Sequence, residues 1–370
     1  MFKNYKNEGI ISNIEDQRNI MVFIGNGFDI SVLKKYRNDA LVSSYNKFYD
    51  FLCYKDINKS NVLYKKMGND KLQGKENWSD FEYALEELLR TNIPAQELEK
   101  ALKEIQKMFL LFLNEIVTPE VLLRLNEDAV KNQWGKNVLS SFLGDLDQND
   151  YEKIKFPEAT NHYCMYNYLF INFNYTSLFD DYIFLDKWQF DPHPYKYVDT
   201  NYSFLPNPNG FHKNGSNEET KWSSFIMFDI IHPHGYQSIP RSLLFGIESE
   251  NKDKEVKNFT KSYWIQSNQK YKSYFNKADL FIIYGSSIGV TDSWWWRQIY
   301  NSLLEGRGEL IIYYYCDKSI EKEMVKQMFI NACGIGDTNE KQELVKDKIY
   351  VVLYNENTSK RMFTLKEIVH

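Results

Sequence analysis

Several features are missing from this 370-residue sequence, and each absence excludes a class of protein. No stretch approaches the roughly 18 consecutive apolar residues of a membrane span, and the start of the chain lacks the apolar segment of a secretory signal peptide. We therefore expect a cytoplasmic protein without a membrane anchor. The formal net charge of −5 provides no basic field for wrapping nucleic acid, so nucleic-acid binding is not indicated.

The chain also lacks a cysteine framework. Its four cysteines, Cys53, Cys164, Cys316 and Cys333, are scattered and include no CxxC pair. This spacing argues against both a disulfide framework and a zinc ribbon. No metal site is predicted.

What the sequence does contain is a series of patterns typical of short, buried strands. Six runs of apolar, β-branched or aromatic residues are bounded by polar residues or glycine, as in a parallel sheet. Helical patterns, for example at 294–304 and 320–330, separate several of them. This alternation predicts a layered α/β fold with a mostly parallel, Rossmann-like sheet. The six runs are 20–24, 168–173, 225–231, 280–284, 310–315 and 349–353.

The stretch between the first two runs differs from the rest. Residues 38–158 are charged, poor in strand signals and carry apolar residues at helical spacing, which predicts a helical insertion. Residues 1–37 and 159–370 would then form the nucleotide-binding domain. Within the insertion, Ser79 and Glu82 predict a capping box at a helix start.

Gly25-Asn26-Gly27 directly follows the first predicted strand. Glycines there let the backbone turn tightly and approach a phosphate, whose charge the next helix N-terminus favours. Ile30 stands at the third glycine position of a GxGxxG fingerprint, which disfavours a conventional dehydrogenase. A tight turn without a ligand is the alternative. Asp29 either caps the next helix or projects its carboxylate into the same cleft.

Two further motifs end predicted strands, where α/β proteins bind ligands. The amide of Asn174 suits a ribose hydroxyl or a water, with a helix cap as the alternative. His232 and His234 follow the third strand, and alternation would place both on one face. Either is a natural general base near neutral pH, unless backbone groups satisfy the ring. Metal binding by the pair is disfavoured because no cysteine or acidic third ligand lies nearby in the sequence.

Small and hydroxyl residues follow the fourth predicted strand. Gly285-Ser286-Ser287 is placed to contact a phosphate or ribose, and Thr291 or Asp292 is expected to cap the next helix. That helix carries three consecutive tryptophans at 294–296. We interpret them as core or subunit interface in preference to a base-stacking surface.

In this order, five motifs resemble those of the AbiH family of bacteriophage abortive-infection proteins. AbiH proteins in turn look like distant relatives of the sirtuin-like fold, which carries a glycine turn, an Asn-containing strand end, a His-Gly motif and a Gly-Ser turn. The resemblance implies an abortive-infection role and an NAD site. The five motifs are residues 24–29, 78–82, 173–176, 232–235 and 284–292.

The resemblance assigns roles to individual residues. Asn174 matches the ribose-binding asparagine and His234 the catalytic histidine, and we add Asp29 as a third candidate catalytic residue. Thr176 stands where sirtuins often carry Asp. The expected nucleotide contacts are Gly25, Asn26, Gly27, Phe28, Tyr175, Thr176, Gly285, Ser286, Ser287 and Asp292.

Sirtuin deacylases carry a four-cysteine zinc module that this chain cannot build, so a protein deacylase is disfavoured. The remaining hypothesis is a sirtuin-like effector that hydrolyses NAD to nicotinamide and ADP-ribose and depletes the infected cell. In this hypothesis Asp29 stabilises positive charge on the ribose, while Asn174 and His234 deliver water. An irregular segment at 187–221, rich in Pro, Asn, Gly and Tyr, is expected to form a lid.

Two alternatives stay open. One is a nucleotide sensor without turnover, whose insertion engages a partner, and the other is an ADP-ribosyltransferase. Because an NAD-depleting effector must be silent before infection, we also expect a phage-encoded trigger and a homo-oligomer. The insertion and residues 294–296 are the expected interface surfaces.

Overall fold

The computed structural model describes residues 2–5, 14, 16–39, 41–157, 164–185, 202–203, 223–248, 254–316, 320–358 and 361–367. Of the expected lid at 187–221, only Tyr202 and Ser203 fall within these ranges, so the lid lies outside the described residues. Across the ranges given, no helix combines the length and apolar character needed to cross a membrane.

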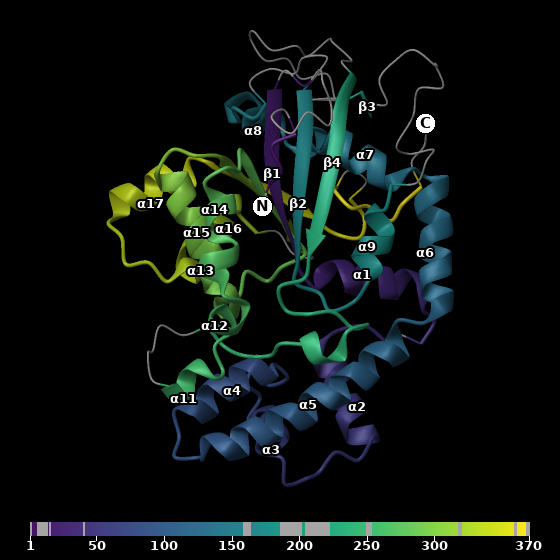
Figure 1. The fold of residues 1–370 in the computed structure, drawn as a ribbon, viewed down its shortest axis with the longest axis vertical. Coiled ribbons are helices and arrows are strands. Elements are labelled where there is room, and N and C mark those ends of the chain that lie inside the picture. Colours follow the sequence, from purple (N-terminus) through teal and green to yellow (C-terminus); the bar gives the residue numbers. More distant parts are fainter. Residues whose placement is uncertain are drawn as a thin grey trace.

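The described chain forms one sheet from β1 (Asp16–Ile24), β2 (Cys164–Asn172), β3 (Tyr202–Ser203), β4 (Ser223–Ile231), β5 (Leu280–Tyr284), β6 (Glu309–Tyr315) and β7 (Ile349–Tyr354). Their order is β3-β4-β2-β1-β5-β6-β7, partly visible in Figure 1. All neighbours pair in parallel except β3, which runs antiparallel to β4 at one edge. Numbered by chain order, the parallel strands follow 3-2-1-4-5-6, the Rossmann order. The predicted α/β class is confirmed.

The parallel strands coincide with the six apolar runs because both faces of the sheet are covered. β2 and β5 are buried along their whole length, so no alternation with a solvent face appears in their sequence. β2 begins before the predicted start at residue 168, in a stretch that includes polar Asn167. That amide donates to Oδ1 of Asn19 on β1 (3.2 Å), which explains a polar residue in a buried strand.

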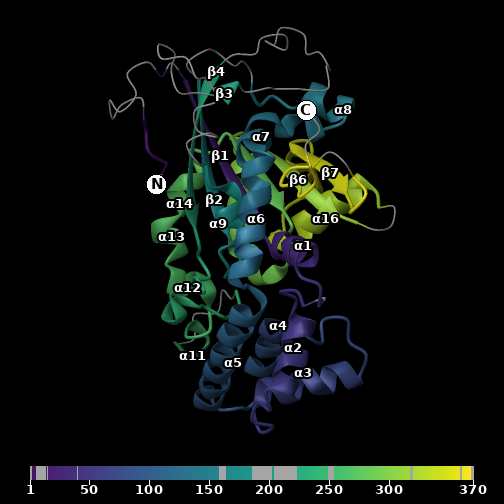
Figure 2. The ribbon, with the colours of Figure 1, turned by 90° about the vertical axis from the view of Figure 1, so that its right-hand side faces the viewer.

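Helices cover both faces of the sheet (Figures 1 and 2). On β1, Ile20, Val22 and Ile24 join one core cluster, while Met21 and Phe23 join another on the opposite face. The first face is covered by α1 (Gly27–Tyr36), α6 (Pro119–Lys131), α7 (Trp134–Ser141) and α9 (Leu178–Ile183). The second is covered by α14 (Lys272–Phe275), α15 (Ser293–Leu304), α16 (Lys322–Cys333) and α17 (Asn339–Lys346).

The chain between α1 and β2 is helical. Its bundle of α2 (Tyr45–Tyr54), α3 (Val62–Leu72), α4 (Phe81–Leu89) and α5 (Ala95–Ile116) lies beyond the carboxyl ends of β1, β2 and β4 (Figures 1 and 2). The bundle and the first sheet face share one continuous apolar core. The division into separate domains stays a prediction. The shorter elements are η1 (Phe142–Asp145), α8 (Gln148–Lys153), η2 (Pro240–Ser242), α11 (Lys254–Lys257), α12 (Lys261–Ile265), α13 (Ser267–Lys270) and η3 (Val290–Asp292).

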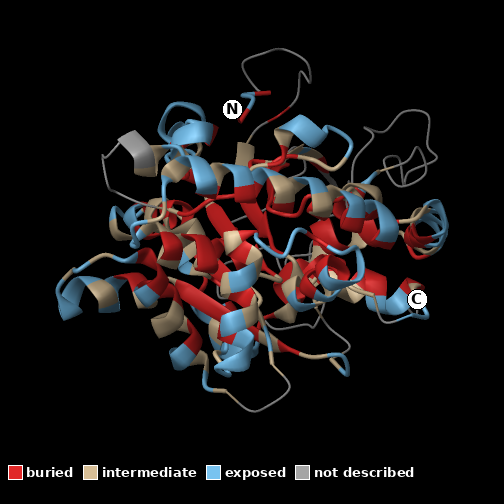
Figure 3. Cartoon of the chain, turned by 90° about the horizontal axis from the view of Figure 1, so that it is seen from below, coloured by how far each residue is buried: buried red, intermediate tan, exposed pale blue. Residues whose placement is uncertain are grey.

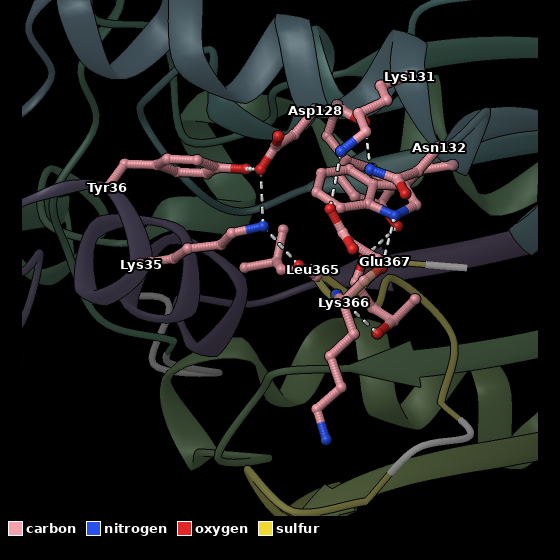
Figure 4. A network of polar contacts seen from close by, with 11 residues as sticks. Lys35, Tyr36, Asp128, Lys131, Asn132, Leu365, Lys366 and Glu367 are labelled. Atoms are coloured by element: carbon pink, nitrogen blue, oxygen red, sulfur yellow. Dashed lines mark hydrogen bonds and ion pairs between the residues drawn. The ribbon is translucent and has the colours of Figure 1, made fainter. Parts of the chain in front are cut away.

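A polar network ties α1 to α6 and to the segment at 361–367 (Figure 4). Asp128 on α6 accepts hydrogen bonds from Nζ of Lys35 and from the hydroxyl of Tyr36 on α1, both at 2.7 Å. Lys35 also donates to the carbonyl of Leu365 (2.6 Å). These bonds hold α1, the helix that leaves the glycine turn, against the helices that follow the bundle.

The three tryptophans of α15 belong to the second core cluster. The Phe23 ring of β1 packs edge-on against Trp295 and Trp296, at centroid distances of 6.0 and 5.9 Å. Figure 3, coloured by burial, shows buried residues gathered towards the middle of the molecule and exposed residues mostly on its outer surface. The core interpretation is confirmed. All three rings are buried within the chain itself, and whether α15 contacts a subunit partner stays a prediction.

Trp296→Ala is expected to lower the free energy of unfolding by about 3–5 kcal/mol, because it leaves a cavity in a packed core. It also removes the hydrogen bond that the indole donates to the carbonyl of Gly289 (2.8 Å). Urea denaturation followed by circular dichroism measures the loss. Trp264→Ala is the matched control: Trp264 is 55% exposed, and its removal should cost less than about 1 kcal/mol. Equal losses would contradict the packing described.

Candidate functional site

A cavity of about 630 Å³ lies at the carboxyl ends of β1, β2 and β5, between the sheet and the α2–α5 bundle. From β1 the chain builds β2 and β4 on one side and then returns to add β5 on the other. The cavity therefore occupies the topological switch point of the sheet, where α/β proteins bind ligands. Residues of α2, α4 and α5 complete its walls.

The structure brings nearly all of the predicted site residues to this cavity. Phe28 is the exception, because its ring packs edge-on against Phe179 and Tyr182 in the core, at 5.2 Å from each. Within the described ranges, no group of three or more His, Cys, Asp or Glu side chains is arranged to hold a metal ion. The predicted residues that line the cavity are Gly25, Asn26, Gly27, Asp29, Asn174, Tyr175, Thr176, His234, Gly285, Ser286, Ser287 and Asp292.

The turns after β1 and β5 pack backbone against backbone. The N–H of Gly25 donates to the carbonyl of Tyr284 (2.9 Å), and that of Gly27 donates to the carbonyl of Gly285 (2.7 Å). A Cβ on Gly25 would lie 2.6 Å from both the Gly285 carbonyl oxygen and the Cα of Ser286. Gly285 has φ +65, in the left-handed region that glycine tolerates. This packing requires glycine at these positions whether or not a ligand binds.

Asn26 connects the glycine turn to the insertion. It occupies the N-cap position of α1, but its side chain does not cap the helix. Its amide nitrogen donates to the carbonyl of Ser43 (2.8 Å), and its amide oxygen accepts from the hydroxyl of Ser43 (2.6 Å). The segment that leads into α2 is thereby fixed to the cavity wall.

Asp29 is a buried acid in the first turn of α1. One carboxyl oxygen accepts a hydrogen bond from the hydroxyl of Thr176 (2.7 Å), and the other has no hydrogen-bond partner among the described residues. Burial raises the pKa of Asp29 to about 7. Asp29 therefore does not cap α1, and it lines the cavity with one carboxyl oxygen left without a partner among the described residues.

Asn174 is held at the end of β2 by three hydrogen bonds. Its N–H donates to Oδ1 of Asn172 (3.0 Å), and its side-chain amide donates to the carbonyl of Gly25 (3.2 Å). Its own carbonyl accepts from Nδ1 of His232 (3.0 Å). Nε2 of His232 lies 3.0 Å from the carboxylate of Asp180, which fixes the ring. His232 thus supports the backbone of Asn174.

His234 lines the cavity. Its ring stacks on Phe173 with centroids 4.9 Å apart, and the backbone reverses immediately after it at Gly235, whose φ is +96. The prediction that His232 and His234 share one face is wrong. β4 ends at Ile231, so strand alternation does not extend to either histidine.

His234 lies at the end of a chain of buried charges. Its Nε2 is 3.2 Å from Oδ1 of Asp292, within ion-pair range but without a hydrogen bond of good geometry. The same Asp292 oxygen is 3.5 Å from Nζ of Lys261. Lys261 donates to Glu82 on α4 (2.8 Å), whose other oxygen accepts from the N–H of Gly246 (3.1 Å). The chain of charges links the insertion to His234.

Burial and mutual attraction set the protonation of these groups. Burial, reinforced by Lys261, lowers the pKa of His234, so its ring is neutral near pH 7. Burial raises the pKa of Glu82 to about 7. Burial opposes the charge on Asp292, but Lys261 and His234 outweigh it and hold the pKa of Asp292 below its usual range. Burial likewise opposes the charge on Lys261, but Asp292 and Glu82 raise its pKa.

The sequence did not reveal the role of α4. The predicted capping box is wrong, because Asp80 is the N-cap and accepts from the N–H groups of Glu82 (3.0 Å) and Tyr83 (3.1 Å). Glu82 is free to reach Lys261 instead. Aspartate is a common N-cap, so the sequence could have indicated Asp80 as the cap of α4. No sequence pattern could have indicated the ion pair of Glu82 with Lys261, because the two residues lie 179 positions apart.

The fold and this cavity define a Rossmann-like α/β protein with a pocket at its topological switch point, closed on one side by a helical insertion. A sequence profile of the family described as bacteriophage abortive infection AbiH matches residues 21–314, a range that contains all five motifs. The chain belongs to this AbiH family, and membership implies a role in phage abortive infection. No curated protein and no solved structure matches the chain.

Gly25→Ala is expected to lower the free energy of unfolding by about 1–3 kcal/mol, because the added Cβ meets backbone atoms that cannot move aside independently. Thermal or urea unfolding measures the effect. Gly336→Ala is the matched control, since a Cβ there has nothing within 4 Å. It should change stability by no more than about 1 kcal/mol, in the stabilising direction. A fully stable Gly25→Ala protein would contradict the close approach of the two turns.

Asp29→Asn is expected to change how stability depends on pH. A carboxyl with a raised pKa in the folded state binds its proton more tightly there, so its contribution to stability falls between the ordinary value of 3.8 and about 7. The variant lacks this titration. Its free energy of unfolding relative to wild type should rise by roughly 4 kcal/mol from about pH 4 to about pH 7. Urea denaturation across that range tests this, and a constant difference would contradict it.

Proposed function

We propose that this AbiH protein hydrolyses the bond between nicotinamide and ribose in NAD, and that the resulting loss of NAD arrests the infected cell. The proposal rests on one observation: the glycine turn, Asn174, His234 and Asp29 converge on a single cavity. That cavity lies where Rossmann folds bind dinucleotides. The resemblance of the motifs to the sirtuin-like fold supports the same assignment.

The chemistry requires stabilised positive charge. Cleavage of an N-glycosidic bond passes through an oxocarbenium-like state, and nicotinamide leaves the cationic pyridinium as a neutral molecule, so the leaving group needs no proton. Fixed carboxylates in a low-dielectric cavity stabilise such a cation. Asp292 is held ionised by Lys261, and Asp29 presents an oxygen without a partner among the described residues. We assign both to this role.

His234 is suited to accept a proton from the attacking water or from a ribose hydroxyl. Its ring is neutral near pH 7, and Asp292 lies close enough to stabilise the imidazolium that forms. Asn174 is the neighbouring amide, rigidly anchored at the end of β2, and we assign it the orientation of that water or hydroxyl.

Purified protein incubated with NAD is expected to release nicotinamide and ADP-ribose in equal amounts, which liquid chromatography resolves. His234→Ala and Asn174→Ala should each lower the rate at least about a hundredfold, because each removes a group that acts on the attacking water. Asn331→Ala is the control for Asn174→Ala, since Asn331 is exposed on α16 and should leave the rate unchanged.

Other outcomes separate the remaining hypotheses. Tight NAD binding without products, even with a phage trigger present, would contradict hydrolysis and favour a nucleotide sensor. Nicotinamide release with ADP-ribose attached to a protein or nucleic acid would indicate transfer to an acceptor instead of water. Mass spectrometry of the acceptors distinguishes transfer from hydrolysis.

A further inference from the structure

The insertion gives the cavity an aromatic wall. Tyr45 of α2 and Phe109 of α5 line it together with Tyr175, which follows β2. The rings of Phe109 and Tyr175 are edge-on, with centroids 5.2 Å apart, and Tyr45 packs against Phe81 of α4 at 4.9 Å. These contacts fix the rings in place. Aromatic faces held rigidly in a cavity attract cations through the ring quadrupole.

The same part of the cavity has an excess of carboxyl groups. Asp80 at the N-cap of α4, Glu82 of α4 and Asp292 of η3 line it, and among the described residues they surround the ammonium group of Lys261. Burial raises the pKa of Asp80, and raises that of Glu82 to about 7, despite the attraction of Lys261. When the three carboxyl groups are ionised, the single charge of Lys261 compensates only part of their negative charge. A bound cation would supply the missing positive charge.

A third observation points to a ligand in this cavity. Asp29 is 1% exposed and lines the same cavity, yet one of its carboxyl oxygens has no hydrogen-bond partner among the described residues. Buried polar groups are nearly always hydrogen-bonded, so an acceptor of this kind indicates a further donor that the described residues do not supply, and a ligand bound in the cavity would provide one.

We infer that Tyr45, Phe109 and Tyr175, with Glu82 as the counter-charge, form a subsite for an aromatic cation, the pyridinium ring of the substrate. This inference rests on the proposed function for the identity of the ring. It makes the insertion part of the substrate site, and it makes the insertion's residues determinants of specificity for nucleotides with a positively charged base. A neutral base in this subsite would leave the negative charge of the carboxylates without a matching positive charge.

The subsite should bind cations more tightly as the pH rises. Glu82 faces Asp80 at the N-cap of its own helix, Lys261 on α12, Asp292 on η3, and the hydroxyl-bearing rings of Tyr45 and Tyr175. Its ionisation near pH 7 adds the negative charge that a cation needs. Asp29 and Glu248 have pKa values raised to about 7 by burial as well, so a variant must identify the responsible group.

The experiment compares two fragments of nearly the same shape. 1-Methylnicotinamide carries a permanent positive charge, and nicotinamide is neutral; isothermal titration calorimetry with the full chain measures both at pH 6 and pH 8. At pH 8 the cation should bind at least about fivefold more tightly than nicotinamide. Raising the pH from 6 to 8 should strengthen cation binding about fivefold or more as Glu82 ionises, and leave nicotinamide unchanged.

Variants then assign the effect to residues. Glu82→Gln should abolish the pH dependence of cation binding, and Tyr45→Leu should weaken cation binding roughly threefold to fivefold. The matched controls are Glu86→Gln on α4 and Tyr54→Leu on α2, which lie outside the cavity lining and should bind the cation as wild type does. Circular dichroism confirms that each variant is folded, and Tyr45→Leu tests the subsite even where Glu82→Gln does not fold.

The outcomes separate this inference from the proposed function. Equal affinity for both fragments at pH 8, or a pH dependence that persists in Glu82→Gln, would overturn the subsite even where NAD is hydrolysed. Selective, Glu82-dependent cation binding in a protein that releases no nicotinamide would support the subsite and contradict the hydrolase.

Discussion

The site depends on the direct contact between two backbone turns. Gly25 and Gly27 after β1 lie against Gly285 after β5, with hydrogen bonds of 2.9 and 2.7 Å across the contact and no room for a Cβ. β1 and β5 are adjacent strands at the switch point of the sheet, and the three glycines of this contact line the cavity. The contact also sets where α1 begins, and with it the position of Asp29. Asn174 is fixed to the same turn through the carbonyl of Gly25.

The sequence predicted the sheet and the residues that end its strands. Strands buried on both faces appear as continuous apolar runs, and the carboxyl ends of parallel strands meet at one edge, so Asn174, His234 and Gly285 could be placed together from local patterns. Strand alternation gave the wrong orientation for the two histidines, because their orientation depends on the residue at which β4 ends. β4 ends at Ile231, and His232 therefore turns toward Asp180 while His234 enters the cavity.

The site residues that sequence analysis missed come from elements that lie far apart in the sequence. Glu82 and Lys261 belong to a helix of the insertion and to a short helix after β4, and no local pattern connects them. Once both are buried they must pair, because an isolated charge in the interior costs several kcal/mol. The pair therefore links α4 to α12, and Lys261 also lies near the oxygen of Asp292 that faces His234. The insertion is in this way a structural part of the site.

Two buried acids show how the cavity differs from the rest of the fold. Glu309 on β6 accepts hydrogen bonds from the N–H groups of Lys155 and Phe156 and from the hydroxyl of Tyr350, so its burial is fully compensated and serves the fold. Asp29 keeps an oxygen without a partner among the described residues. Two residues beyond Ser286, Ile288 holds φ +54, a strained conformation for a β-branched residue. Uncompensated burial and backbone strain lower stability, and proteins retain them where function requires them. Here both occur at the switch point of the sheet, which is the physical reason to place a ligand there.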